Sequence, residues 1–318
     1  MGKGYLKAKS KLKQSGISNT KKLMSMPAKK PPFISHNIDT EDLDWDIDTD
    51  PRFYLAGTQE IACYWTNCKQ VFYRYRHIQQ ANPETFVYFN SLFAKDDKRC
   101  YSMWHELKGT QPDNFHVLNE CYATDYQAIW ASNRRLGLAD GKTFEVCDDG
   151  LAKFDFSHDW DWHREFTDGI KRIVLAPVPA GYAKDSQQVY YNFDGRIKIM
   201  PKADPATFVS MNDGIFAKDE HHVFYEARIL PRANPAAWQK LTHGYSKDDK
   251  HIYYDNRLIK EADHDTFEVV QLTRPQGDNW AFGKDKNQYY CNGEAITEAE
   301  VWESADTFAS IIVPDVFS

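Results

Sequence analysis

The feature that most restricts the fold of this chain is a repeat of aromatic residues around an aspartate. Aligned on the Asp of a Lys-Asp pair, the copies carry Asn67, Asp96, Asp125, Asp185, Asp219, Asp248 and Asp285. In each copy an aromatic residue stands three positions earlier, another stands five positions later, and a third follows 19 or 23 positions later. Each unit of such an array must bury its apolar face against its neighbours, so the repeat predicts a row of similar stacked units.

The copy at residues 245–270 shows how each unit is expected to fold. Residues 251–254 combine aromatic and β-branched types, which favour a strand. The polar residues 247–250 before them favour a turn, because an Asp side chain accepts backbone N–H groups two residues on. An Asn-Pro or Asp-Pro pair later in some copies, such as Asn234-Pro235, is typical of a short helical turn. Each copy is therefore predicted to contain a strand, a turn, a strand, a helical turn and a closing strand.

Several copies resemble the motif that names the DKNYY repeat family. The resemblance is clearest in Lys284-Asp285-Lys286-Asn287-Gln288-Tyr289-Tyr290 and extends over roughly residues 55–312. It implies a bacterial protein of a family that is often exported or lipid-anchored and has no agreed activity or catalytic residues. Two copies depart from the motif, with Asn67 in place of the Asp and Thr124 in place of the Lys, and these copies are either decayed or specialised.

The predicted fold class is all-β, a tandem array of seven or eight short β-meander repeats. The array is expected either to stay open as a solenoid-like stack or to close into a propeller-like ring. A copy of about 29 residues is short for a four-stranded blade, which favours the stack or three-stranded units. The predicted domains are a basic tail at 1–38 and one repeat domain at 39–318, with copies near 64–86, 93–115, 122–144, 154–175 (degenerate), 182–208, 216–238, 245–267 and 282–308.

The first 32 residues contain nine Lys and no acid, and this tail is predicted to be disordered. It is either a solvated terminus, an address read by other machinery, or an electrostatic tether to an acidic partner, an anionic membrane or nucleic acid. We find no apolar run long enough for a signal peptide or a transmembrane helix. With six scattered cysteines expected to be reduced, the predicted location is cytoplasmic.

Two acidic segments are the candidate binding sites. Residues 39–50 alternate acids with apolar residues and are expected to form a charged edge strand, an intrachain partner for the tail or a Ca²⁺ site. Residues 154–166 are either a degenerate copy, an aromatic and acidic binding loop, or an acid–base or metal site. The candidate binding residues are Asp42, Asp44, Trp45, Asp46, Asp159, Trp160, Asp161, Trp162, His163 and Glu165.

The sequence favours a non-enzymatic, protein-binding scaffold without a cofactor or metal. It contains no GxGxxG, P-loop, GxSxG or HExxH motif, and the repeated Lys-Asp pairs are interpreted as turn residues. Because the net charge is −7, a specific form of the hypothesis is an immunity or antitoxin-like protein that neutralises a basic partner, and nucleic acid is not expected to bind. The alternative is a metal-dependent or hydrolytic enzyme with its site in the loop at 154–166.

Overall fold

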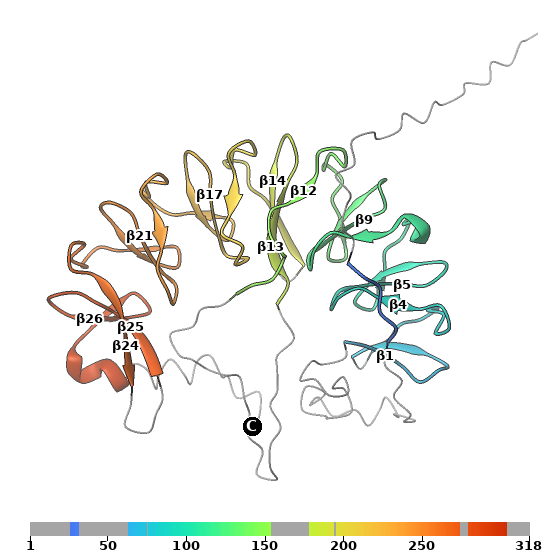
Figure 1. Cartoon of the computed structure of the whole chain (residues 1–318), viewed down its shortest axis with the longest axis horizontal. Helices are drawn as coiled ribbons and strands as arrows, with labels where there is room; N and C mark the ends of the chain where they lie inside the picture. Colours follow the sequence, from blue (N-terminus) through green and yellow to red (C-terminus); the bar gives the residue numbers. More distant parts are fainter. Residues whose placement is uncertain are drawn as a thin grey trace, which may run out of the picture.

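Seven small antiparallel sheets follow one another along an arc in the computed structural model of the chain (Figure 1). The structure describes residues 26–31, 63–74, 76–153, 178–193, 195–273 and 279–303. The first and seventh sheets lie at opposite ends of the arc (Figure 1). The prediction of an all-β array of repeated meanders is therefore confirmed, with one sheet for each of the seven aligned copies.

Each sheet takes its strands in chain order, and the second to seventh sheets have four strands. The first sheet contains β1 (Tyr64–Thr66), β2 (Val71–Tyr73) and β3 (Arg76–His77). The second and third contain β4 (Val87–Tyr88), β5 (Phe93–Lys95), β6 (Cys100–Ser102) and β7 (His105–Glu106), then β8 (His116–Val117), β9 (Tyr122–Thr124), β10 (Ile129–Ala131) and β11 (Arg134–Arg135). The fourth contains β12 (Glu145–Val146), β13 (Ala180–Lys184), β14 (Val189–Phe193) and β15 (Arg196–Ile199).

The remaining sheets repeat this pattern. The fifth contains β16 (Val209–Ser210), β17 (Phe216–Lys218), β18 (Val223–Tyr225) and β19 (Arg228–Ile229). The sixth contains β20 (Gln239–Lys240), β21 (Tyr245–Lys247), β22 (Ile252–Tyr254) and β23 (Arg257–Ile259). The seventh contains β24 (Glu268–Thr273), β25 (Asn279–Lys284), β26 (Tyr289–Cys291) and β27 (Glu294–Ile296). Two single turns of 3₁₀ helix, η2 (Pro112–Asn114) and η3 (Glu298–Glu300), complete the described elements.

The expectation of three-stranded units was wrong for six of the seven sheets. A short copy suffices for four strands because most of the strands are two or three residues long. The strand that closes one copy becomes the first strand of the next sheet, as when Val87–Tyr88 pairs with Phe93–Lys95. A tight turn with a residue at positive φ, such as Asp255 at 50°, then adds the fourth strand.

The three aromatic positions of the repeat meet between neighbouring sheets. Phe267, which closes the sixth copy, packs against Tyr245 of its own copy at 5.6 Å between ring centroids and against Tyr290 of the next copy at 5.7 Å. The same arrangement recurs around Phe86, Phe144 and Phe208. Phe144 is half-buried and the other rings are buried, so the aromatic spacing seen in the sequence is the spacing of the contacts that stack one sheet on the next.

The motif aspartate is a buried hydrogen-bond acceptor at the junction of two sheets. We call the segment between the last strand of one sheet and the first strand of the next a linker. In the fourth sheet, Asp185 Oδ1 accepts the N–H groups of Gln187 and Gln188, both at 2.8 Å. Its Oδ2 accepts the N–H of Asp140 in the preceding linker at 3.0 Å and the hydroxyl of Tyr190 at 2.7 Å.

The bond from the preceding linker recurs in every sheet that has the Asp. The acceptors Asp96, Asp125, Asp219, Asp248 and Asp285 receive the N–H groups of Asn82, Gln111, Asp204, Asn234 and Asp263. The interpretation of the Asp as a turn residue is confirmed, and the same carboxylate also holds neighbouring units together. Asn67 in the first sheet keeps the turn bonds through its Oδ1, which accepts the N–H groups of Lys69 and Gln70.

The motif lysine joins its sheet to the linker that follows. Lys95 Nζ donates to the carbonyl oxygen of Pro112 at 2.7 Å, and Lys218 Nζ donates to that of Pro235 at 3.1 Å. Lys184 reaches Phe208 in the same way, at 3.3 Å. In these sheets the Lys-Asp pair therefore ties one hairpin to the linkers on both of its sides.

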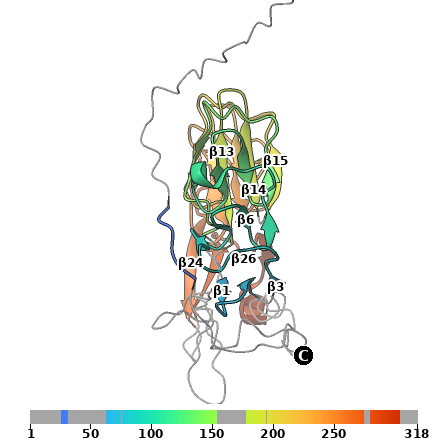
Figure 2. The ribbon, with the colours of Figure 1, turned by 90° about the vertical axis from the view of Figure 1, so that its right-hand side faces the viewer.

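Residues 26–31 of the predicted tail contact the array. Lys29 and Tyr88 exchange backbone hydrogen bonds of 2.7 and 2.9 Å, so this segment adds to the free edge of β4. Met26 donates its N–H to Val117 of the third sheet, and Lys30 Nζ donates to the carbonyl of Glu84. The segment, blue in Figure 2, runs along the side of the arc where β24, the first strand of the seventh sheet, lies, and the last strands β15 and β3 lie toward the other side.

A row of amide and carboxyl side chains orders the turns before the second strands. Asn90 and Asn119 each accept two N–H groups of their own turn and donate Nδ2 to a backbone carbonyl of the next unit. Asp148 takes this place in the fourth sheet, where it accepts the N–H groups of Gly150 and Tyr182 and the hydroxyl of Ser210. Burial raises the pKa of Asp148 to about 6 despite these donors.

Replacing Asp185 with Ala is expected to lower the free energy of unfolding by about 3 to 5 kcal/mol, because several buried donors lose their acceptor. Asn67→Ala, which removes turn bonds from a half-buried side chain, is expected to cost about 1 kcal/mol. Urea denaturation of both variants checks this. Equal costs for the two substitutions would contradict the junction role of the Asp.

Asp148→Asn is expected to change how stability depends on pH. The folded protein holds a proton on Asp148 up to about pH 6, whereas the unfolded chain releases it near pH 4. Stability from this proton is therefore complete below about pH 4 and is lost as pH rises through 6. Relative to the wild type, Asp148→Asn should gain about 2 to 3 kcal/mol in unfolding free energy between about pH 4 and pH 7. Urea denaturation at several pH values checks this. If the difference in unfolding free energy between the variant and the wild type stayed constant from about pH 4 to about pH 7, the raised pKa would be contradicted.

Candidate functional site

A threonine replaces the motif lysine in the first and third sheets, and in both its hydroxyl bonds within its own hairpin turn. In the third sheet Thr124 stands in that place, and its hydroxyl accepts the N–H of Tyr126 and donates to the carbonyl of Ala128, both at 3.0 Å. Tyr126 itself adopts a φ of 67°, which is uncommon for a residue other than Gly, Asn or Asp. The Thr side chain therefore bonds within its own hairpin, in the place where Lys95, Lys184 and Lys218 reach the following linker.

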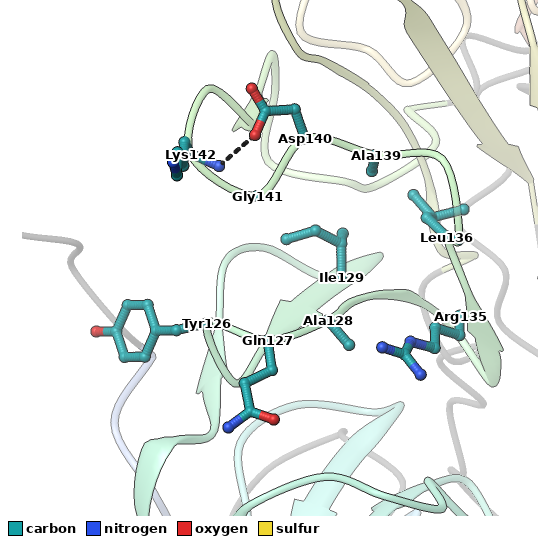
Figure 3. Close-up of a pocket in the computed structure, with 11 residues that line it drawn as sticks. Tyr126, Gln127, Ala128, Ile129, Arg135, Leu136, Ala139, Asp140, Gly141 and Lys142 are labelled. Carbon is teal, nitrogen blue, oxygen red and sulfur yellow. Dashed lines mark hydrogen bonds between the residues drawn. The ribbon is translucent and has the colours of Figure 1, made fainter. Parts of the chain in front are cut away.

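An open pocket of about 550 Å³ separates this turn from the linker that follows it (Figure 3). One wall is the turn at 126–129 and the other is the segment at 135–142, and these are the two parts of a unit that the motif lysine joins in other sheets. The lining residues are Tyr126, Gln127, Ala128, Ile129, Arg135, Leu136, Gly137, Ala139, Asp140, Gly141 and Lys142. We call this space the third-sheet pocket.

The apolar part of the third-sheet pocket is partly open to solvent. Ile129 is buried and projects into the space between the two walls (Figure 3). At the rim, the Tyr126 ring is 46% exposed and makes an edge contact with His116 at 5.0 Å between ring centroids. Leu138, in the same linker, is 74% exposed, the highest value among the large apolar side chains of the described ranges. Exposed apolar side chains around a concavity are typical of a binding site.

The charged part of the third-sheet pocket is cationic. Arg135 and Lys142 line it, and within the described part of the chain neither side chain forms an ion pair. Asp140 also lines it, but its Oδ1 accepts the N–H of Lys142 and its Oδ2 accepts the hydroxyl of Thr143, both at 3.0 Å. Asp140 keeps its negative charge, but the guanidinium of Arg135 and the ammonium of Lys142 outnumber it, so the lining of the pocket carries a net positive charge.

Next to the pocket, the aromatic position five residues after the Asp is occupied by Trp130. In four other sheets a Tyr hydroxyl from this position reaches the motif Asp, as Tyr101 reaches Asp96 at 2.8 Å. Trp130 Nε1 is buried and has no hydrogen-bond partner among the described residues. The third copy thus departs from the repeat at two interactions, both of which lie around the same turn.

The sequence-predicted site residues lie outside the described residues, and the structure does not test them. This applies to Asp42, Asp44, Trp45, Asp46, Asp159, Trp160, Asp161, Trp162, His163 and Glu165, and to the degenerate copy at 154–175. The residues that flank the second segment are described: Ala152 donates to the carbonyl of Val178 at 2.9 Å, and Leu151 bridges to Pro179. The described residues that flank 154–177 therefore lie together, between β12 and β13.

No three His, Cys, Asp or Glu side chains of the described ranges are grouped so that they could hold a metal ion. All six cysteines are free thiols, and burial raises the pKa of Cys100 and Cys147 to about 12. None of the helices in the described ranges has the length and apolar character needed to cross a membrane.

Sequence reasoning missed the third-sheet pocket, although one signal was present. Thr124 was identified as a departure from the Lys-Asp motif, and the copy was interpreted as decayed or specialised. The consequence could not be seen, because the lysine joins two segments whose proximity appears only in three dimensions. Tyr126 and Leu138 carried no motif of their own.

Comparison with known proteins agrees with the repeat. The family model of the DKNYY family matches residues 62–162 and 245–310, which together are more than half of the chain. The chain therefore belongs to the DKNYY family. No curated protein and no solved structure matches it.

Substitutions at the rim of the third-sheet pocket are expected to leave the fold intact. Tyr126→Ala combined with Leu138→Ser should change the free energy of unfolding by less than about 1 kcal/mol, because both side chains are exposed. Ile129→Ala, in the buried wall, should lower it by about 2 to 4 kcal/mol. Thermal and urea unfolding check both values. A large loss in the rim variant would show that Tyr126 and Leu138 hold the fold together.

Proposed function

We propose that this chain is a non-enzymatic, protein-binding repeat scaffold and that the third-sheet pocket anchors its partner. The observation that carries the proposal is the pocket itself, lined by the exposed Tyr126 and by Arg135, with the exposed Leu138 in the linker that forms one of its walls. Aromatic residues and Arg provide most of the energy of protein interfaces when an apolar anchor enters a concavity beside them. A repeat array that holds one such site on short, well-bonded turns is suited to this role.

The bonding of the other copies supports the same assignment. In the six sheets with the motif Asp, the carboxylate is taken up by the turn and the preceding linker, so it is not free to meet a ligand. Lys95, Lys184 and Lys218 are likewise bonded to a following linker. The first and third copies have a Thr in place of that lysine, and the pocket lies in the third.

The finer forms of the hypothesis remain predictions. Neutralisation of a basic partner, as by an immunity or antitoxin-like protein, depends on the acidic segments 39–50 and 154–166, which lie outside the described residues. The alternative of an enzyme with its site at 154–166 depends on the same loop, and so do the metal ligands it would need. Our proposal places the scaffold in a bacterial cytoplasm, supported by its six free thiols.

Affinity purification of the full-length protein from its native cells tests the binding function. We compare the wild type with Tyr126→Ala/Leu138→Ser and with a control, Ile199→Ser/Val209→Ser, which removes two exposed apolar side chains of the fourth and fifth sheets. The rim variant should lose the co-purifying protein by about tenfold or more, which corresponds to about 1.4 kcal/mol of binding energy. The control should retain it. Equal recovery by the rim variant and the wild type would contradict the proposal.

A further inference from the structure

We propose that the third-sheet pocket recognises an acidic segment of the partner protein that carries an apolar side chain. This inference rests on the proposed binding function and specifies the chemistry of the partner. The segment places its apolar side chain against Ile129 and Leu136 and its carboxylate against Arg135 and Lys142. The pocket has an apolar part and a cationic part, so a ligand that is only apolar or only anionic would leave one of them without a partner.

The sign of the partner's charge follows from the local groups and not from the net charge of the chain. The chain is acidic, but seven aspartates of its described ranges are buried, namely Asp96, Asp125, Asp185, Asp213, Asp219, Asp248 and Asp285. At the third-sheet pocket the exposed cations Arg135 and Lys142 have no carboxylate partner within the described ranges, and Arg134 adds a third cation one residue away. Opposite charge on a partner strengthens binding at such a surface and guides the encounter.

Both walls are needed to explain the ligand. An apolar group alone would enter the pocket beside an Arg135 guanidinium that loses water without gaining a partner, which is unfavourable. A bare anion would leave the half-buried Leu136 and the exposed Tyr126 uncovered and gain none of the energy of burying them. A carboxylate beside an apolar side chain satisfies both, because Arg binds carboxylates through two parallel N–H groups.

The described surface fits an acidic polypeptide better than a nucleic acid. Single-stranded nucleic acids bind where several aromatic rings stack on successive bases along a cationic groove. Among the large apolar side chains of the described ranges, the exposed ones are Tyr126, Leu138, Ile199 and Val209, and only the first is aromatic. One ring and a small group of cations match a single peptide anchor with flanking acids.

The absence of the motif lysine provides a further test of the same pocket. In the fifth sheet the ammonium of Lys218 donates to the carbonyl of Pro235 in the following linker. Pro235 comes directly after Asn234, whose N–H is bonded to the motif Asp of the next sheet, Asp248. Gly141 holds the corresponding place after Asp140 in the linker of the third sheet. Thr124→Lys is expected to join the hairpin to this linker and to fill the space that the ligand would occupy.

The experiment measures fluorescence anisotropy with short labelled probes and the full-length protein. The probes are a peptide with a central Leu-Phe pair flanked by glutamates, the same peptide with lysines in place of the glutamates, polyglutamate, and a single-stranded oligonucleotide. The first probe should bind the wild type most tightly. Tighter binding of the lysine peptide or of the oligonucleotide, or equal binding of polyglutamate, would overturn the inference.

Variants assign the binding to the pocket. Arg135→Glu/Lys142→Glu and Thr124→Lys should each weaken binding of the glutamate peptide by about tenfold or more. The control Lys98→Glu/Lys250→Glu makes the same change in net charge at two exposed turns of other sheets and should bind as the wild type does. Unchanged binding by the Arg135→Glu/Lys142→Glu variant would overturn the inference, as would equal losses in the control.

The two proposals fail in different ways. If the rim variant loses the native partner but the charge variants keep it, the protein-binding function stands and the acidic partner is wrong. If none of the pocket variants affects capture of the native partner, both proposals fall. Far-UV circular dichroism and thermal unfolding of every variant confirm that a loss of binding is not a loss of fold.

Discussion

The array depends on one buried carboxylate, repeated in six of its seven sheets, on which donors from two neighbouring units converge. Asp185 shows the arrangement: two N–H groups of its own turn, one N–H of the preceding linker and one Tyr hydroxyl reach its two oxygens. Burial alone raises the pKa of this Asp, but these donors outweigh burial and hold its pKa below the usual value. Strands of two or three residues form few backbone hydrogen bonds with their neighbours. The hydrogen bonds to the buried carboxylate compensate for this small number.

The same dependence explains where the structure leaves room for function. A unit in which both members of the Lys-Asp pair are bonded has its hairpin tied to the linkers on either side. The third copy keeps Asp125 and its bond to Gln111 but has Thr124 in place of the lysine. It therefore stays joined to the unit before it, while the space toward its following linker is open as the third-sheet pocket. A binding site can thus arise in one copy without loss of the array.

Much of the fold could be predicted from the sequence because its main contacts have fixed spacing. The aromatic positions around Asp248 indicate the packing of Tyr245, Phe267 and Tyr290, and the polar turn indicates the role of the Asp. The fourth strand was missed because β19 and its equivalents are too short to show a period of two. The pairing of Lys29 with Tyr88 was missed because it joins distant segments through backbone groups, which leave no side-chain pattern.

The candidate site was less predictable than the fold. The sequence drew attention to clusters of Trp, His and Asp at 154–166, whereas the pocket is formed by residues such as Ile129 and Leu136 that look like ordinary strand and linker residues. The turn at 126–129 and the segment at 135–142 form a pocket only because the fold leaves a space between them, which the sequence does not show. The charge of the pocket depends on which carboxylates are buried. Asp140, for example, lines the pocket but is occupied by Lys142 and Thr143.

The most direct test of this account is hydrogen exchange, followed by mass spectrometry, of the full-length protein with and without its captured partner. If the third copy is the binding unit, partner binding should slow exchange at 124–142 and leave the corresponding segments 95–114 and 218–237 unchanged. Slowed exchange at those other segments, with none at 124–142, would contradict the claim that the departure from the Lys-Asp motif creates the site.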